Sequence, residues 1–132
     1  MVGPDAQQVF MIADYLGKLA NLLGEYIDFN KGNLGADERN KLYDAEIELA
    51  RLAGETNIIG VNLAFDNIQR LLSQLEQITA GVKQTVKKAL AVQEAIKIAT
   101  GLVSMGTAIL SNNPQAVLQT TTDLGKSLNL KL

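Results

Sequence analysis

Apolar residues recur at helical spacing along most of the 132-residue chain. Over residues 5–28 and 36–53 they fall three and four positions apart, which is the spacing of one buried face of an amphipathic helix. The turn cluster NKGNLG separates these two segments, and Gly54 is a natural helix stop after the second. The pattern therefore predicts two helices, over about 5–28 and 36–53.

The longest apolar pattern runs from Val61 to Val103, with positions that alternate four and three residues apart without a slip. Such a heptad seam is typical of a long helix that packs against others. Because a loop would normally disturb the phase, we predict one helix over about 57–110, spanning ~80 Å. Gly81 is unfavourable inside a helix by about 1 kcal/mol relative to Ala, so a break into two helices at that residue stays open.

The sequence SNNP at residues 111–114 ends the long helix and begins another. Asn113 is a good N-cap residue, and Pro114 suits the first helical position. A last helix over about 114–128 can then fold back along the long one. The four segments predict an all-α fold: a single domain over residues 1–132, built as an antiparallel helical bundle around one long helix with a kink allowed at Gly81.

The first two predicted helices, ~36 Å and ~27 Å long, are too short to cover the whole long helix. Part of the seam would then face water, and exposed apolar patches of this kind mark interaction sites. A second copy of the chain is the simplest cover, and a helix of a partner protein is the other. The expected contact residues are Phe65, Leu72, Leu75, Val82, Val86, Leu90 and Ile96.

An uncharged segment, residues 98–110, is rich in Gly, Ala, Ser and Thr. As a helix it is ~20 Å long, short of the ~30 Å hydrocarbon core of a bilayer. It has a bulky ridge and a strip of small residues on which another helix can pack closely. We expect a buried helix covered by the last helix, and the alternative is insertion into a membrane after a conformational change. The residues concerned are Ile98, Gly101, Leu102, Ser104, Met105, Gly106, Ala108 and Ile109.

Residues 86–128 form two predicted helical arms joined by SNNPQAVL, with the uncharged segment in the first arm. This arrangement is similar to that of helical pore-forming toxins of the haemolysin BL type, in which long helices flank a charge-free segment rich in Gly and Ala. The resemblance implies a membrane-active function in which segment 98–110 contacts lipid.

The composition excludes much of the chemistry that a sequence can reveal. The chain has no Cys and no His, so zinc sites, common haem sites and His-based catalytic triads lack their ligands or bases. Asp44 and Glu48 share a helical face, but their charge-rich surroundings predict a solvated surface rather than a catalytic pair. The stretch DFNKGNLGADER resembles a calcium-binding loop at its first positions only, and its twelfth residue is Arg39 instead of Glu, which favours a simple turn. We expect no enzymatic activity, no cofactor and no metal.

Charge is distributed unevenly along the chain. The formal net charge is −2, with five basic and 11 acidic residues in 1–66 and seven basic and three acidic residues in 67–132. The two halves attract each other, which would favour antiparallel pairing of two copies. The overall negative charge argues against a nucleic-acid partner. We therefore predict a non-enzymatic helical interaction or assembly protein, a homodimer or a protein that docks partner helices.

The first residues, MVGPDAQQ, lack the basic and apolar regions of a Sec signal peptide. This favours the cytoplasm, although export by a dedicated secretion machine would leave no such mark.

Overall fold

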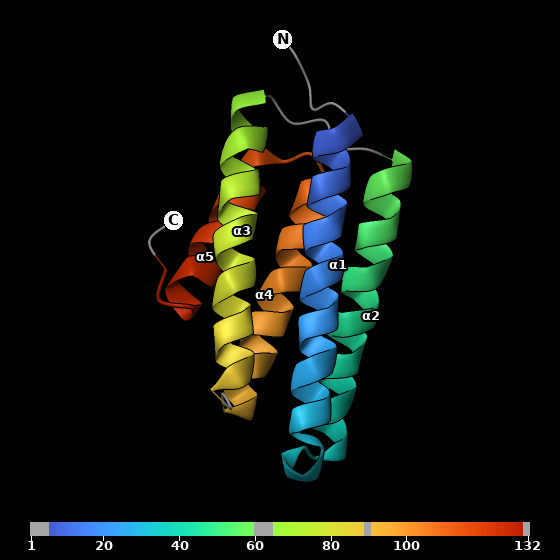
Figure 1. The fold of residues 1–132 in the computed structure, drawn as a ribbon, viewed down its shortest axis with the longest axis vertical. Coiled ribbons are helices and arrows are strands. Elements are labelled where there is room, and N and C mark those ends of the chain that lie inside the picture. Colours follow the sequence, from blue (N-terminus) through green and yellow to red (C-terminus); the bar gives the residue numbers. More distant parts are fainter. Residues whose placement is uncertain (1–5, 60–64, 89–90, 131–132) are drawn as a thin grey trace.

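Five α-helices make up most of the described chain (Figure 1). The structure is a computed structural model, and it describes residues 6–59, 65–88 and 91–130. The elements are α1 (Ala6–Phe29), a short 3-10 turn η1 (Lys31–Asn33), α2 (Ala36–Ile59), α3 (Phe65–Lys87), α4 (Val92–Leu110) and α5 (Pro114–Ser127). No strand occurs within the described ranges. The predicted all-α helical bundle is therefore confirmed.

The first four helices lie along the long axis of the molecule, and the colours of Figure 1 show that each runs opposite to the one before it. α1 packs against α2 and α3, and α2 also packs against α4. The short α5 lies on the outside, mainly against α4 and over a shorter stretch against α3. The hairpin of α1 and α2 thus forms one side of the molecule, while α3, α4 and α5 form the other.

One apolar core runs between the helices and takes residues from all of them. On α1 the buried stripe includes Ile12, Leu16, Leu19 and Ile27, three to eight positions apart, as expected for the inner face of an amphipathic helix. Fully burying a Leu or Ile side chain contributes roughly 1.5–3 kcal/mol relative to leaving it in water. The other large fully buried side chains of the described residues include Leu42, Leu49, Ile68, Leu71, Leu75, Ile78, Leu102 and Met105.

The predicted continuous helix over 57–110 is wrong. α2 runs through Gly54 to Ile59, where the prediction placed a stop near residue 53, and α3 and α4 are separate helices. The predicted alternative break at Gly81 is also wrong, because α3 passes through this residue. The chain instead reverses between Lys87 and Val92.

Gly81, in the interior of α3, allows close packing of this helix against the residues that follow α5. A Cβ at this position would lie 3.2 Å from Leu130 Cδ1 and 3.4 Å from Leu128 Cδ1, which is tighter than an ordinary van der Waals contact. The glycine therefore lets the chain beyond α5 approach α3. The helical hydrogen bonds continue through it because its neighbours compensate for its low helix propensity.

The start of α5 follows its sequence signals. Asn113 has an extended conformation, and its side-chain Oδ1 accepts a hydrogen bond from the backbone N–H of Ala116 at 3.2 Å. Pro114 occupies the first turn, where its missing N–H would have no helical partner. The helix ends at Ser127, against the predicted 128, and α1 spans 6–29 against the predicted 5–28.

Candidate interaction surface

The predicted partner seam lies mostly inside the single chain. Leu75, Val82 and Val86 are buried in the core, with exposed fractions of 0%, 2% and 7%. They are therefore unavailable to a second chain, and this part of the interface prediction is wrong. The prediction assumed one long helix that its neighbours could not cover. Because the chain reverses after α3, that long helix does not form.

The other seam residues whose side chains the structure describes add no exposed stripe. Leu72 and Ile96 are half-buried and pack against the core. Leu90 and the side chain of Phe65 lie outside the described residues. On α4 the inner face is formed by Ala95, Ile98, Leu102, Met105 and Ile109, so the heptad phase does not carry over from α3 to the inner face of α4.

Segment 98–110 forms the buried part of α4. Ile98, Leu102, Met105 and Ile109 are core residues, with Gly106 and Ala108 also buried, Gly101 half-buried and Ser104 exposed. A Cβ on Gly101 would lie 2.9 Å from Leu124 Cδ2 of α5, and a Cβ on Gly106 would lie 2.9 Å from Leu52 Cδ1 of α2. Both glycines thus permit close helix packing within the chain. Among the described helices, none is long and apolar enough to cross a bilayer.

The other sequence candidates lie at the surface of α2 and in the turn before it. Asp44 and Glu48 line an open pocket on α2 together with Thr100 and Ser104 of α4. No group of three or more acidic side chains that could hold a metal ion occurs in the described ranges. Asn30 ends α1 by donating its side-chain amide to the carbonyl of Tyr26 at 2.9 Å, and Glu38 accepts a hydrogen bond from the backbone N–H of Gly35 at 2.9 Å. The residues between α1 and α2 thus serve as helix caps, in the turn that the sequence favoured.

Exposed large apolar residues concentrate on the α1–α2 hairpin. Five of the six in the described part of the chain lie there: Phe10, Met11, Phe29, Ile47 and Ile58. The sixth, Leu118, is on α5. Large contiguous apolar exposure marks interaction surfaces, whereas single exposed residues are ordinary. The hairpin is therefore the side of the molecule on which a partner surface is best sought.

A groove of about 400 Å³ runs between the outer sides of α1 and α2. Its floor and walls are mostly small residues: Ala13, Gly17 and Ala20 of α1, and Ala50, Ala53 and Gly54 of α2. Phe10 borders the groove, as do the polar residues Asp14, Lys18, Asn21 and Asn57. We call this hollow the α1–α2 groove.

The two glycines of the α1–α2 groove differ from those that pack within the chain. A Cβ built on Gly17 or on Gly54 meets no atom within 4 Å. Each glycine nevertheless lies inside a helix, where it is less favourable than Ala by roughly 0.5–1 kcal/mol. Nothing in the part of the chain that the structure describes requires either residue to be glycine.

We therefore expect Gly17→Ala and Gly54→Ala each to stabilise the fold, by about 0.5–1 kcal/mol, because Ala is the better helix former and its methyl group enters open space. Chemical denaturation at low protein concentration measures the change. Gly101→Ala is the contrasting variant, because its methyl group would press on Leu124, and it is expected to gain nothing or to destabilise. If the three substitutions changed the free energy of unfolding equally, the conclusion that the methyl group enters open space at Gly17 and Gly54 would be wrong.

Charged side chains of the α1–α2 hairpin are paired, both in the groove and away from it. In the groove, Lys18 Nζ lies 3.1 Å from Asp14 Oδ2. On the side of α2 where Glu48 lines a separate pocket with residues of α4, Arg51 donates hydrogen bonds to both Glu48 and Glu55. The hydrogen bonds from Arg51 lower the pKa of the Glu48 carboxyl, and those same bonds raise the pKa of Arg51. Asp14 and Lys18 are the charged residues that line the groove, and they pair with each other. The groove is therefore close to neutral at pH 7, although the hairpin as a whole is acidic.

Glu46 of α2 lies over Gly24 of α1 beyond the groove. A Cβ on Gly24 would come 2.6 Å from Glu46 Oε2, so here the glycine makes room for the carboxylate. Burial raises the pKa of Glu46, and the nearby charge of Asp28 raises it further. This contact also aligns the two helices, because it places residue 24 level with residue 46.

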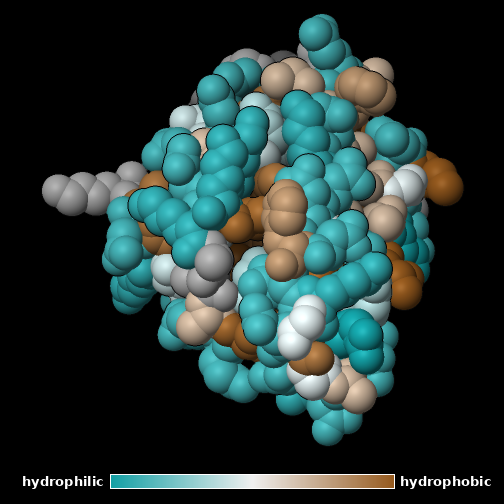
Figure 2. All heavy atoms as spheres, turned by 60° about the horizontal axis from the view of Figure 1, so that its bottom comes forward, coloured by the Kyte–Doolittle hydropathy of each residue, from teal (hydrophilic) through white to brown (hydrophobic). Residues whose placement is uncertain are grey.

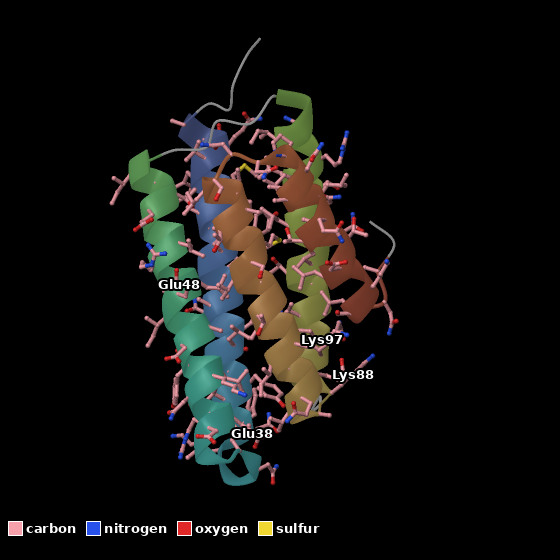
Figure 3. The ribbon with its side chains drawn as sticks, turned by 180° about the vertical axis from the view of Figure 1, so that it is seen from behind. Glu38, Glu48, Lys88 and Lys97 are labelled. Atoms are coloured by element: carbon pink, nitrogen blue, oxygen red, sulfur yellow. The ribbon has the colours of Figure 1, made fainter. Side chains whose placement is uncertain are left out.

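The hairpin side of the bundle carries more acidic than basic side chains, and the side formed by α3, α4 and α5 carries more basic than acidic ones. Figure 3 shows Glu38 and Glu48 on α2, and Lys88 and Lys97 beside α3 and α4. The uneven charge of the two sequence halves therefore becomes an uneven charge of the two sides of one molecule. The end of the molecule seen in Figure 2 is mostly hydrophilic, and its hydrophobic residues appear in separate small groups.

Sequence reasoning missed the α1–α2 groove, although the sequence contains a signal for it. Ile47, Ala50, Gly54 and Ile58 share one side of α2, as their spacing of three, four and four shows, and Phe10 and Gly17 share one side of α1. Both stripes lie opposite the strongest apolar stripe of their helix. A search for a second, weaker stripe would have found them.

Comparison with known proteins gives no further assignment. No protein-family model matches the chain, and neither a curated protein nor a solved structure does so.

Proposed function

We propose that this protein is a non-enzymatic helical interaction protein and that it binds its partner through the outer side of the α1–α2 hairpin. We call this surface the hairpin face: the α1–α2 groove together with Phe10, Ile47 and Ile58. The observation that carries the proposal is an open groove lined by Gly and Ala and accompanied by large apolar side chains that are 60%, 64% and 84% exposed.

Small residues let two helices approach closely, because no side chain holds their backbones apart. Bulky residues further from the point of closest approach then fill the widening space between the helices. The hairpin face has this order of sizes, with Gly17 and Gly54 in the groove and Phe10, Ile47 and Ile58 around it. Binding would remove these apolar side chains from water, which contributes about 25 cal/mol per Å² of apolar surface.

The membrane-active alternative lacks a comparable observation. Its segment, 98–110, supplies core residues such as Leu102 and Met105, each with an exposed fraction of 0%. Contact with lipid would require α4 to leave α2 and α5, with which it packs. The hairpin face needs no such rearrangement, and for this reason we favour the interaction function.

Filling the α1–α2 groove is expected to weaken helix binding. Ala50→Gln places a long side chain in the groove, and Ala80→Gln makes the same change at an exposed position on α3. Both substitutions lower helix propensity equally, by less than about 0.5 kcal/mol, so their effects on folding are matched. Peptides selected from a displayed library of amphipathic helices serve as probes, and fluorescence anisotropy measures their Kd on each variant.

We expect Ala50→Gln to weaken the selected peptides at least about tenfold, which corresponds to 1.4 kcal/mol, and Ala80→Gln to leave them unchanged. Peptides that bind all three proteins equally would show that the preferred helix-binding surface lies elsewhere, and the proposal would then fail.

A further inference from the structure

We infer that the hairpin face binds the hairpin face of a second copy of this chain, in a two-fold symmetric dimer whose hairpins run antiparallel. The inference rests on the proposed function, because it names the partner of that same surface. Three features of the hairpin face support it: the order of residue sizes along the helices, the area that the face offers, and the positions of its charges.

The large apolar side chains of the hairpin face lie on both sides of its glycines along the helices. Residue 24 of α1 lies level with residue 46 of α2. The two helices run in opposite directions and each rises 1.5 Å per residue, so Gly17, seven residues before residue 24, is level with residue 53. Gly17 therefore lies within about one residue of the level of Gly54. Phe10 is then about 10 Å to one side of this level and Ile58 about 6 Å to the same side, while Ile47 is about 10 Å to the other. A two-fold axis through the glycines, perpendicular to the helices, brings Phe10 of one copy to the level of Ile47 of its partner.

The area of the hairpin face fits a hairpin better than a single helix. α1 and α2 have 24 residues each, and are therefore ~36 Å long. At an interaxial distance of ~10 Å, two such helices present roughly 700 Å², close to the ~800 Å² that each partner buries in a standard interface. One docked helix would cover the groove and leave much of this face in water.

The charges favour the antiparallel arrangement. The acidic residues Glu25, Asp28, Asp37 and Glu38 lie near the turn between α1 and α2. Parallel hairpins would bring these two groups together, and like charges at short distance repel. Antiparallel hairpins place them at opposite ends of the dimer. The centre of the face carries the pair Asp14–Lys18, so no net charge opposes the contact there.

The mass in solution is the first test. Size exclusion with light scattering is expected to give twice the chain mass of 14.2 kDa for the native protein and for Ala80→Gln, and the single chain mass for Ala50→Gln. A native monomer would overturn the inference, and so would a dimer that survives Ala50→Gln. If the native protein is a monomer but loses its selected peptides in Ala50→Gln, the proposed function stands and only the inferred partner is wrong.

The second test uses the absence of cysteine from the chain, so that any introduced cysteine is unique. A disulfide requires Cα atoms about 4.4–6.8 Å apart, a condition that only residues close to the two-fold axis meet. Gly17→Cys and Ala53→Cys lie at the groove, and Phe29→Cys, 74% exposed, lies at the acidic end. Ala53→Cys adds only a sulfur atom, so that it tests the same region with little change in volume.

Under mild oxidation, at least one groove cysteine is expected to form disulfide-linked dimers at least about tenfold faster than Phe29→Cys, as measured on non-reducing gels. Preferential cross-linking of Phe29→Cys would show a parallel arrangement and overturn the antiparallel one. Equally slow cross-linking of all three variants would place the glycines away from any two-fold axis and contradict the inference.

Discussion

Gly106→Asp is expected to destabilise the fold of this protein strongly. Gly106 is buried on α4, and a Cβ there would lie 2.9 Å from Leu52 Cδ1 and 3.6 Å from Leu16 Cδ2. An Asp side chain therefore has to displace core side chains, and its carboxylate would have only apolar neighbours at these positions. Burying an unpaired charge in this way is expected to remove more than about 3 kcal/mol, out of a total of about 5–15 kcal/mol for a typical domain.

Denaturant titration monitored by far-ultraviolet circular dichroism measures this effect. Gly17→Asp is the matched control, because the same substitution there enters open space and should change the stability by less than about 1 kcal/mol. Gly106→Ala isolates the packing component and is expected to destabilise by about 1–3 kcal/mol through overpacking. A Gly106→Asp variant as stable as Gly17→Asp would show that α4 does not pack as the structure places it.

Segment 98–110 contains both Gly101 and Gly106. The sequence left two explanations for its run of small residues, close packing or contact with lipid. The structure places Gly101 against α5 and Gly106 against α2, so packing within the chain already accounts for both glycines. A loss of lipid binding in Gly106→Asp would report unfolding rather than lipid affinity, and therefore could not test a membrane function.

The helical pattern of the sequence predicted the fold class because the apolar stripes of α1, α2 and α3 coincide with their buried faces. Leu16, Leu42 and Ile68, for example, stand on predicted stripes and are fully buried. The reversal after Lys87 could not be predicted in the same way. The stretch from Lys87 to Val92 reads KKALAV and contains neither Gly nor Pro, so its local propensity favours helix. Burial of α4 against α2 outweighs this local preference.

The candidate surface was harder to predict than the fold. A heptad seam shows which residues avoid water, but only the position of the chain reversal decides whether the same molecule or another one covers them. Once α3 and α4 separate, Leu75 and Val82 become core residues. The exposed stripe with Ile47 and Gly54 instead lies on α2, where apolar residues alternate with many charged ones and the pattern is weak.

Leu75→Ala is expected to destabilise the protein by about 2–5 kcal/mol, because it leaves a cavity at a fully buried position of α3. The effect should be independent of protein concentration, since it acts on the folding of each chain. Ile47→Ala, at a side chain that is 64% exposed, should change the folding of the single chain by less than about 0.5 kcal/mol. Thermal unfolding at several protein concentrations measures both.

The concentration dependence separates a core residue from an interface residue. If two copies bind through the hairpin face, the native melting temperature rises with protein concentration, and Ile47→Ala reduces that rise while Leu75→Ala preserves it at a lower temperature. If the seam on α3 formed the interface instead, Leu75→Ala would abolish the rise of the melting temperature with protein concentration, and it would hardly change the free energy of unfolding of the single chain. The two variants thus decide which apolar stripe meets a second chain, because each removes a side chain from only one of the two surfaces.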